Sequence, residues 1–130
     1  MAAENFQEAA VRHRDDANRL AAGERFQNAG HLIGVAAECL AKSVLQKAGI
    51  TIDKDSPYYT HFPKLAEKIR QLGQGPAMHL LAPIVAKQDF LSGWGVGTRY
   101  DGNLPAPDAE AKYRVWRLDV DSLFNAAGQP

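Results

Sequence analysis

The first half of the chain carries hydrophobic residues at helical spacing. From Phe6 to Leu20 they recur every three or four positions, which predicts a helix that ends near Gly23. A longer stripe runs from Phe26 to Ala48 and predicts a second helix. This second segment is rich in alanine and glycine, which let a neighbouring backbone come close. We therefore expect it at the centre of a bundle or at a dimer seam.

The second half shows shorter helical segments separated by breaks. Residues 50–60 predict a loop, and a short helix is expected over 62–72. The Gly-Gln-Gly-Pro break at 73–76 ends with a proline suited to open the next helix, in which Pro83 predicts a kink or a shorter helix. A last helix is predicted from Asp108. Its inward positions are Ala109, Tyr113, Trp116, Val120 and either Leu123 or Phe124.

These segments predict an all-α protein, an up-and-down bundle of four to five antiparallel helices around one core. No segment has a convincing strand pattern, and there are no internal repeats. The length of 130 residues is close to the commonest size of one domain, so we expect a single domain over residues 1–130. A hydrophobic content of 45% and a charged content of 23% are typical of a soluble globular protein.

The charge balance and the cysteine content exclude several classes of protein. The formal net charge is zero, which argues against strong sequence-independent nucleic-acid binding but allows a local basic patch. A single cysteine, Cys39, excludes an internal disulfide framework and a cysteine-rich zinc site. No apolar run is long enough to span a membrane, and the charged start of the chain does not resemble a signal peptide. We expect a cytoplasmic protein.

The stretch GWGVGTRYDGN at residues 93–103 is the most unusual in the chain. A Walker-type phosphate loop would need a Lys followed by Ser or Thr after a strand, and a dinucleotide fingerprint needs a different glycine spacing. A turn that positions Trp94, Arg99 and Tyr100 is the favoured interpretation. Arg99 could bind phosphate through its planar guanidinium, or it could pair with a carboxylate such as Asp101 or Glu38.

The remaining polar residues give few signals of chemistry. The four histidines form no H-x-x-x-H pair and have no acidic residue at ligand spacing, so we predict no metal site and no cofactor. Glu38 and Lys42 are four residues apart in the favourable order for an ion pair on a helix. They are either a solvated pair worth a few tenths of a kcal/mol or a polar pair that faces an active cleft.

The order of these features resembles a HEPN domain, the helical bundle of prokaryotic toxin–antitoxin, phage-defence and related proteins. The resemblance covers nearly the whole chain. ANRLAAGERFQNAGHLIGVAAECLAKSVL resembles the end of the first helix and the second-helix signature, including Glu38 and Lys42. HFPKLAEKI resembles the segment that opens the third helix, with His61. WGVGTRYDG resembles the aromatic and Arg-Tyr segment before the last helix, with Arg99 and Tyr100.

The resemblance implies a dimeric helical bundle and, in part of the family, a metal-independent endoribonuclease. That activity is linked to an Arg followed after four to six residues by a His near the start of the last helix. In this chain no His follows His79. Arg25 and His31 fit the spacing, but at the start of the second helix, so we interpret the match as coincidental. Tyr100 or Asp101 would have to replace the missing imidazole.

The leading hypothesis is therefore a non-catalytic or degenerate HEPN module. It would be a homodimer that binds RNA, a nucleotide or a protein partner in a toxin–antitoxin or stress-response system, with a nucleotidyltransferase-type protein as one such partner. The first alternative is a metal-independent endoribonuclease with an altered acid–base set, which uses Arg99 and Tyr100 with or without His61. The second is a structural dimerisation module with the small-residue face of the second helix as its seam. The candidate polar cluster consists of Arg99, Tyr100, Asp101, Glu38, Lys42 and His61.

Overall fold

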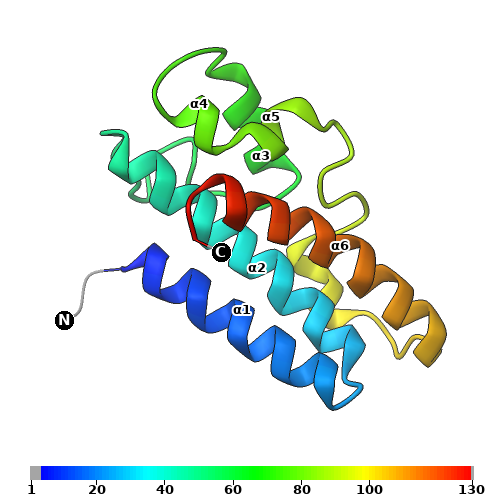
Figure 1. The fold of residues 1–130 in the computed structure, drawn as a ribbon. Helices are drawn as coiled ribbons and strands as arrows, with labels where there is room; N and C mark the ends of the chain where they lie inside the picture. Colours follow the sequence, from blue (N-terminus) through cyan, green and yellow to red (C-terminus); the bar gives the residue numbers. More distant parts are fainter. Residues whose placement is uncertain (1–3, 130) are drawn as a thin grey trace.

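The regular structure of this protein is helical throughout the part that the computed structural model describes, residues 4–129. Three long helices dominate it (Figure 1). They are α1 (Phe6–Ala22), α2 (Phe26–Lys47) and α6 (Ala106–Ala126). Between α2 and α6 lie α3 (Lys64–Gln71), α4 (Ala77–Leu80), α5 (Ala82–Ala86) and the 3-10 helix η1 (Val96–Tyr100). The all-α prediction is confirmed.

The bundle differs from the predicted one in the lengths of its helices. Only three helices are long, and the expected fourth helix is divided into α4 and α5. The division falls at Leu81, and Pro83 lies in the first turn of α5, where its missing N–H has no helical partner to lose. The shorter-helix outcome expected at Pro83 is therefore confirmed. Gly23 ends α1 as predicted, and Asn5 caps its start by accepting a hydrogen bond from the Glu8 N–H at 3.0 Å.

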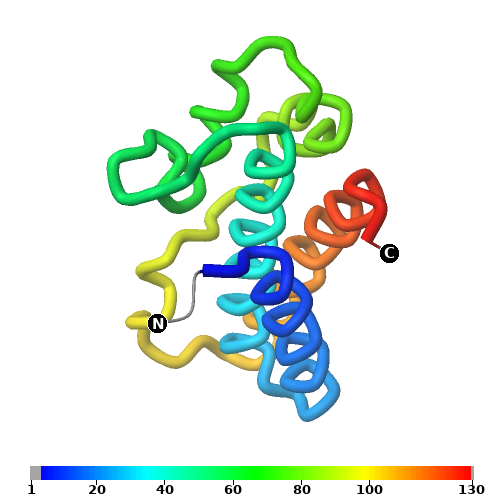
Figure 2. Tube along the Cα trace, turned by 90° about the vertical axis from the view of Figure 1, so that its left-hand side faces the viewer, coloured from blue at the N-terminus to red at the C-terminus, as the bar shows by residue number. Residues whose placement is uncertain are grey.

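Helix α2 is the central element of the molecule. It packs against α1 and α6 and also contacts η1 and α4. Figure 2 shows α2 running through the middle, with the segment that carries η1 on the opposite side from α6. Its buried residues therefore occupy more than one face, unlike those of an ordinary surface helix. The expected central position of this helix is confirmed.

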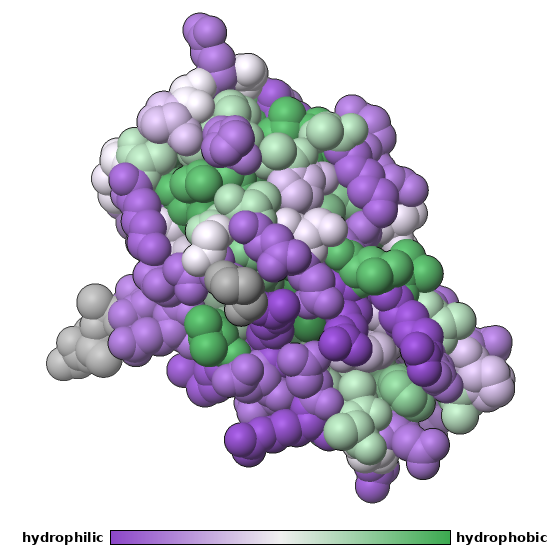
Figure 3. Space-filling view, viewed as in Figure 1, coloured by the Kyte–Doolittle hydropathy of each residue, from purple (hydrophilic) through white to green (hydrophobic). Residues whose placement is uncertain are grey.

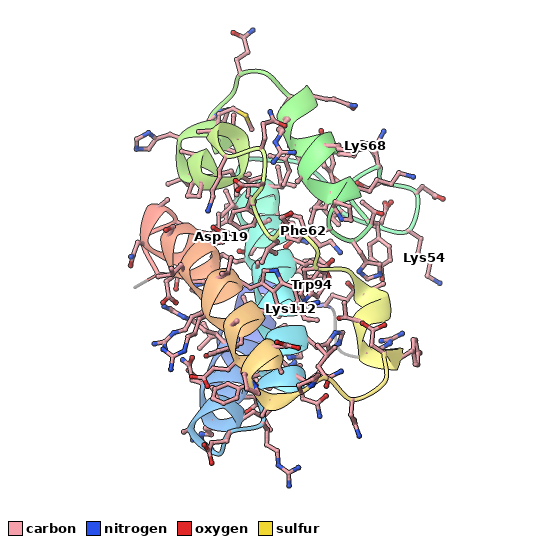
Figure 4. All side chains as sticks on the ribbon, turned by 90° about the vertical axis from the view of Figure 1, so that its right-hand side faces the viewer. Lys54, Phe62, Lys68, Trp94, Lys112 and Asp119 are labelled. Carbon is pink, nitrogen blue, oxygen red and sulfur yellow. The ribbon has the colours of Figure 1, made fainter. Side chains whose placement is uncertain are left out.

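Two tryptophans explain why α2 contains glycine. The Trp94 indole lies against α2 (Figure 4), and a Cβ at Gly34 would come within 2.0 Å of the ring. A Cβ at Gly30 would be 3.0 Å from the Trp116 ring. The Trp94 N–H also donates to the Gly30 carbonyl at 3.0 Å, so the indole is fixed in place. A side chain of the same protomer thus fills the space that Gly34 leaves, and the dimer seam predicted for the small-residue face stays a prediction.

A buried carboxylate on α6 holds the segment that follows α5. Asp119 is 4% exposed, and its Oδ2 accepts a hydrogen bond from the Leu91 N–H at 2.9 Å. The Lys87 ammonium pairs with the other carboxylate oxygen. Leu91 has a φ of 53°, an uncommon conformation for a branched side chain, and its side chain is buried. One buried carboxylate thus holds both the strained backbone at Leu91 and the side chain of Lys87.

The surface around α1 and α6 is mixed in character. In Figure 3 hydrophilic residues cover most of the visible face, and the hydrophobic residues form small separate patches. The largest exposed apolar side chains on α6 are Val115 and Leu118. Within residues 4–129 there is no helix with the length and apolar character needed to cross a membrane.

Gly34→Ala tests the close packing of Trp94 on α2. Because the added methyl group would overlap the indole, we expect a loss of about 1–3 kcal/mol in the free energy of unfolding, measured by urea denaturation. Gly97→Ala is the matched control, since a Cβ there meets no atom within 4 Å. In a double-mutant cycle the effects of Gly34→Ala and Trp94→Ala should be non-additive. Additive effects would contradict the contact.

Candidate functional site

The six residues of the predicted polar cluster fall into two groups in the structure. Glu38, Lys42 and His61 gather where the second half of α2 meets the loop before α3. Arg99 and Asp101 line a pocket at the start of α2. The η1 segment reaches α2 at His31, seven residues before Glu38, or about 10 Å along the helix axis. The glycine-rich loop therefore does not bring Arg99 beside Glu38.

The first group is organised by the Glu38 carboxylate. Its Oε1 lies 3.1 Å from His61 Nδ1, and its Oε2 accepts a hydrogen bond from the Phe62 N–H at 2.7 Å. Phe62 itself is buried in the core, as Figure 4 shows between α2 and the short helices. The carboxylate thus fixes both the backbone entering α3 and the ring orientation of His61. His61 does not cap α3 with its side chain, because Pro63 takes the N-cap position.

Burial governs the chemistry of Glu38. The side chain is 5% exposed, and desolvation raises its pKa above the ordinary value of 4.5. The hydrogen bonds from His61 and Phe62, and the positive charge of Lys42, act in the opposite direction. Because desolvation is the largest effect, proton uptake by Glu38 becomes favourable at a higher pH than for a free carboxyl.

Lys42 is nearly as deeply buried as Glu38 but does not pair with it. The residue is 7% exposed, and its Nζ has no carboxylate oxygen within 4.0 Å among residues 4–129. The ammonium instead lies 5.6 Å from the centre of the Phe6 ring and 5.3 Å from that of Tyr59. The interpretation of Glu38 and Lys42 as a solvated ion pair is therefore wrong, since both are buried. We call Glu38, Lys42, Tyr59 and His61 the Lys42 site.

The second group belongs to a pocket of about 410 Å³ where α2 begins. Gln27 builds one wall by holding the loop before α6 to α2. Its side-chain N–H donates a hydrogen bond to the Gly102 carbonyl at 2.9 Å. Its Oε1 accepts a hydrogen bond from the Leu104 N–H at 2.9 Å. We call this hollow the Arg99 pocket. It is lined by Glu24, Arg25, Phe26, Gln27, Asn28, Thr98, Arg99, Asp101, Asn103, Leu104, Ala106 and Ala109.

The Arg99 pocket is lined mostly by polar residues, with Phe26, Leu104, Ala106 and Ala109 as its apolar members. A smaller space of about 50 Å³ shares several of its lining residues and extends to Trp116 and Lys112. Arg99 has no ion pair with any described carboxylate, so the predicted pairing with Asp101 or Glu38 is absent between residues 4 and 129. Its guanidinium lies 4.8 Å from the centre of the Tyr100 ring. Tyr100 is 77% exposed and forms the outer edge of this region.

His31 lies beside the Arg99 pocket, although the sequence pattern gave it no role. Its ring stacks on Trp94 with a centroid distance of 6.0 Å and an interplanar angle of 17°. Burial lowers the pKa of His31, and the nearby charges of Arg99 and His13 lower it further. The neutral imidazole is therefore favoured next to a fixed positive charge.

Sequence reasoning missed the grouping of Arg25, His31 and Arg99 around η1. The signal was present in the R-F-Q-N-A-G-H spacing, which we interpreted as coincidental. Positions 25 and 31 are not on one face of a helix, so spacing alone does not unite them. The glycine-rich loop joins them by bringing Arg99 to the pocket lined by Arg25 and close to the His31 ring.

Other surfaces offer less chemistry. Another hollow, of about 660 Å³, follows the exposed face of α1, where Glu8, Asp15 and Asp16 alternate with Arg12 and Arg19. Val11 is its only large apolar side chain, so it has no floor for a ligand. Across residues 4–129 no three His, Cys, Asp or Glu side chains are grouped as metal ligands would be.

No family model, curated protein or solved structure matches this chain.

Glu38→Gln tests the buried carboxylate by its pH dependence. Because the folded-state pKa of Glu38 is raised, the wild-type protein must ionise a buried group as the pH rises above about 4.5, and this lowers its stability. Gln carries no charge. The free energy of unfolding of the variant relative to wild type should therefore increase from pH 4.5 toward neutrality, measured by urea denaturation. The exposed Glu67→Gln is the control, and a pH-independent difference for Glu38→Gln would contradict the burial.

Proposed function

We propose that this chain is a HEPN-like, non-catalytic helical module that binds a nucleotide or an RNA segment in the Arg99 pocket. The observation that carries the proposal is that Arg25 and Arg99 line one pocket together with the apolar side chains of Phe26 and Leu104. Neither guanidinium has an ion-pair partner among residues 4–129. Both are therefore available to an anionic ligand.

The lining suits the parts of a nucleotide. Guanidinium groups bind phosphate oxygens through a planar fork of donors. Phe26 and Leu104 give an apolar surface for a base, and the amides of Asn28 and Asn103 can read its polar edge. The carboxylates of Glu24 and Asp101 can accept hydrogen bonds from ribose hydroxyls. They also limit the net positive charge of the pocket. A neutral chain can thus bind one nucleotide unit without the broad basic surface of a general nucleic-acid binder.

The wider setting of the proposal rests on the resemblance to HEPN domains. Under it the module works as a homodimer in a toxin–antitoxin or stress-response system, with a nucleotidyltransferase-type protein as a partner. The order of a long helical pair, short helices and a last long helix supports this reading of the fold.

Arg99→Gln tests nucleotide binding in the pocket. We expect the affinity for a fluorescein-labelled RNA oligonucleotide to fall about tenfold or more, because a charged hydrogen bond to phosphate is lost. The salt dependence of binding should also become shallower by about one phosphate contact. Fluorescence anisotropy over a range of salt concentrations measures both quantities.

Arg12→Gln is the matched control for this experiment. It removes the same charge from an exposed position on α1, outside the lining of the Arg99 pocket, and should leave the affinity unchanged. An equal loss in both variants would mean that the RNA follows overall charge and not the pocket. Retention of full affinity by Arg99→Gln would refute the assignment.

A second candidate function, metal-independent RNA cleavage, is favoured by the position of His31. Its pKa is lowered by burial and by Arg99, so it suits a general base beside a phosphate-binding guanidinium. This changes the altered acid–base set that we considered from sequence, because His61 lies at the other site. His31 takes its place as the candidate base.

Cleavage of labelled RNA in EDTA separates the two candidates. If His31 is the base, His31→Ala should lower the cleavage rate by about a hundredfold or more while RNA binding is largely kept. The exposed His79→Ala is the control and should cleave at the wild-type rate. Absence of cleavage by the wild-type protein would reject this second candidate and favour the binding module.

A further inference from the structure

Lys42 is an ammonium buried without an anionic partner. Charged side chains are almost never fully buried unless they are paired, because removing a charge from water is costly. Lys42 is 7% exposed, yet it makes no ion pair or hydrogen bond with any residue from 4 to 129. The aromatic rings of Phe6 and Tyr59 compensate only part of that cost.

The Lys42 ammonium still reaches the surface. Throughout residues 4–129, every side-chain nitrogen or oxygen that is sealed from solvent has a hydrogen-bond partner. Lys42 Nζ has none, so it is not sealed. Tyr59 stands beside it and is 40% exposed. The ammonium is therefore not fully enclosed, and the ring beside it is itself partly exposed.

His61 supplies a second polar group near Lys42, since the charges of both residues act on Glu38. Its Nδ1 is held 3.1 Å from Glu38, while the side chain is 54% exposed. With Nδ1 engaged, Nε2 is the ring nitrogen left for a ligand, and the imidazolium form donates through Nε2 to an oxyanion while Nδ1 donates to Glu38. The two Glu38 oxygens are taken by the His61 ring and the Phe62 N–H. Glu38 therefore orients the His61 ring and does not neutralise Lys42 by a direct contact.

We propose that the Lys42 site binds a phosphate group, held by Lys42 Nζ and His61 Nε2. This site shares no residue with the Arg99 pocket and does not depend on the function proposed for that pocket. A tetrahedral oxyanion has enough acceptors for both donors at once. Glu4, whose carboxylate accepts the Tyr59 hydroxyl at 3.1 Å, lies at the rim and opposes the anion. It limits the affinity of the site.

Titration with inorganic phosphate tests the proposal directly. Amide signals of ¹⁵N-labelled protein are followed at constant ionic strength, with chloride replaced by phosphate. We expect saturable shifts centred on His61 and Phe62 in the wild-type protein. Lys42→Met should weaken binding about tenfold or more, and Glu4→Gln should strengthen it. Phenyl phosphate is a second probe, and tighter binding than inorganic phosphate would identify an ester whose ring packs on Tyr59.

The controls separate a lost site from a lost fold. Lys47→Met removes the same charge from an exposed position of α2 and should bind phosphate as wild type does. Lys42→Met should melt no lower than wild type, because it removes an uncompensated buried charge. His61→Gln changes an exposed side chain and should weaken binding severalfold even if Lys42→Met fails to fold.

Two results would overturn the proposal, and neither bears on the Arg99 pocket. One is an absence of saturable shifts in the wild-type protein. The other is undiminished phosphate binding in both Lys42→Met and His61→Gln. Arg99→Gln should leave this titration unchanged. A failure of nucleotide binding at the Arg99 pocket can thus be distinguished from a failure of phosphate binding at Lys42.

Discussion

The close approach of two indoles to the backbone of α2 is the constraint on which the rest of the structure depends. Trp94 and Trp116 occupy the space that Gly34 and Gly30 leave open. The first indole holds the segment leading to η1 against α2, and the second belongs to α6. Because close-packed interiors do not yield to an added methyl group, the two glycines fix where both neighbours lie.

Buried carboxylates are the second device that organises the molecule. Glu38 on α2 accepts a hydrogen bond from the Phe62 N–H, and Asp119 on α6 accepts one from the Leu91 N–H. Each carboxylate also faces a cationic or ionisable side chain on the loop that it holds. Irregular segments are thereby tied to long helices through backbone donors that would otherwise lack a partner in the core. The position of these segments therefore depends less on the lengths of the short helices than on the two carboxylates.

Hydrophobic periodicity predicted the long helices well, because α1, α2 and α6 bury their stripes against one another as the pattern requires. The proline rules also predicted the division of the segment around Pro83. The candidate site was harder to predict, because tertiary contacts assemble it. Spacing along a helix says nothing of which turn of α2 meets η1, and it cannot show that Lys42 turns to aromatic rings and away from Glu38.

One side chain, Glu38, both stabilises the fold and orients a side chain of the Lys42 site. The same two oxygens fix the entry to α3 and aim the His61 imidazole. Mutations at position 38 therefore cannot separate ligand recognition from folding, whereas the exposed ring of His61 can vary at little structural cost. During divergence of this protein, the residue at position 61 can therefore change and alter which ligand is bound. Position 38 is constrained both by folding and by the orientation of the neighbouring ring. Related sequences should accordingly keep an acidic residue at position 38 even where the partner histidine has been replaced.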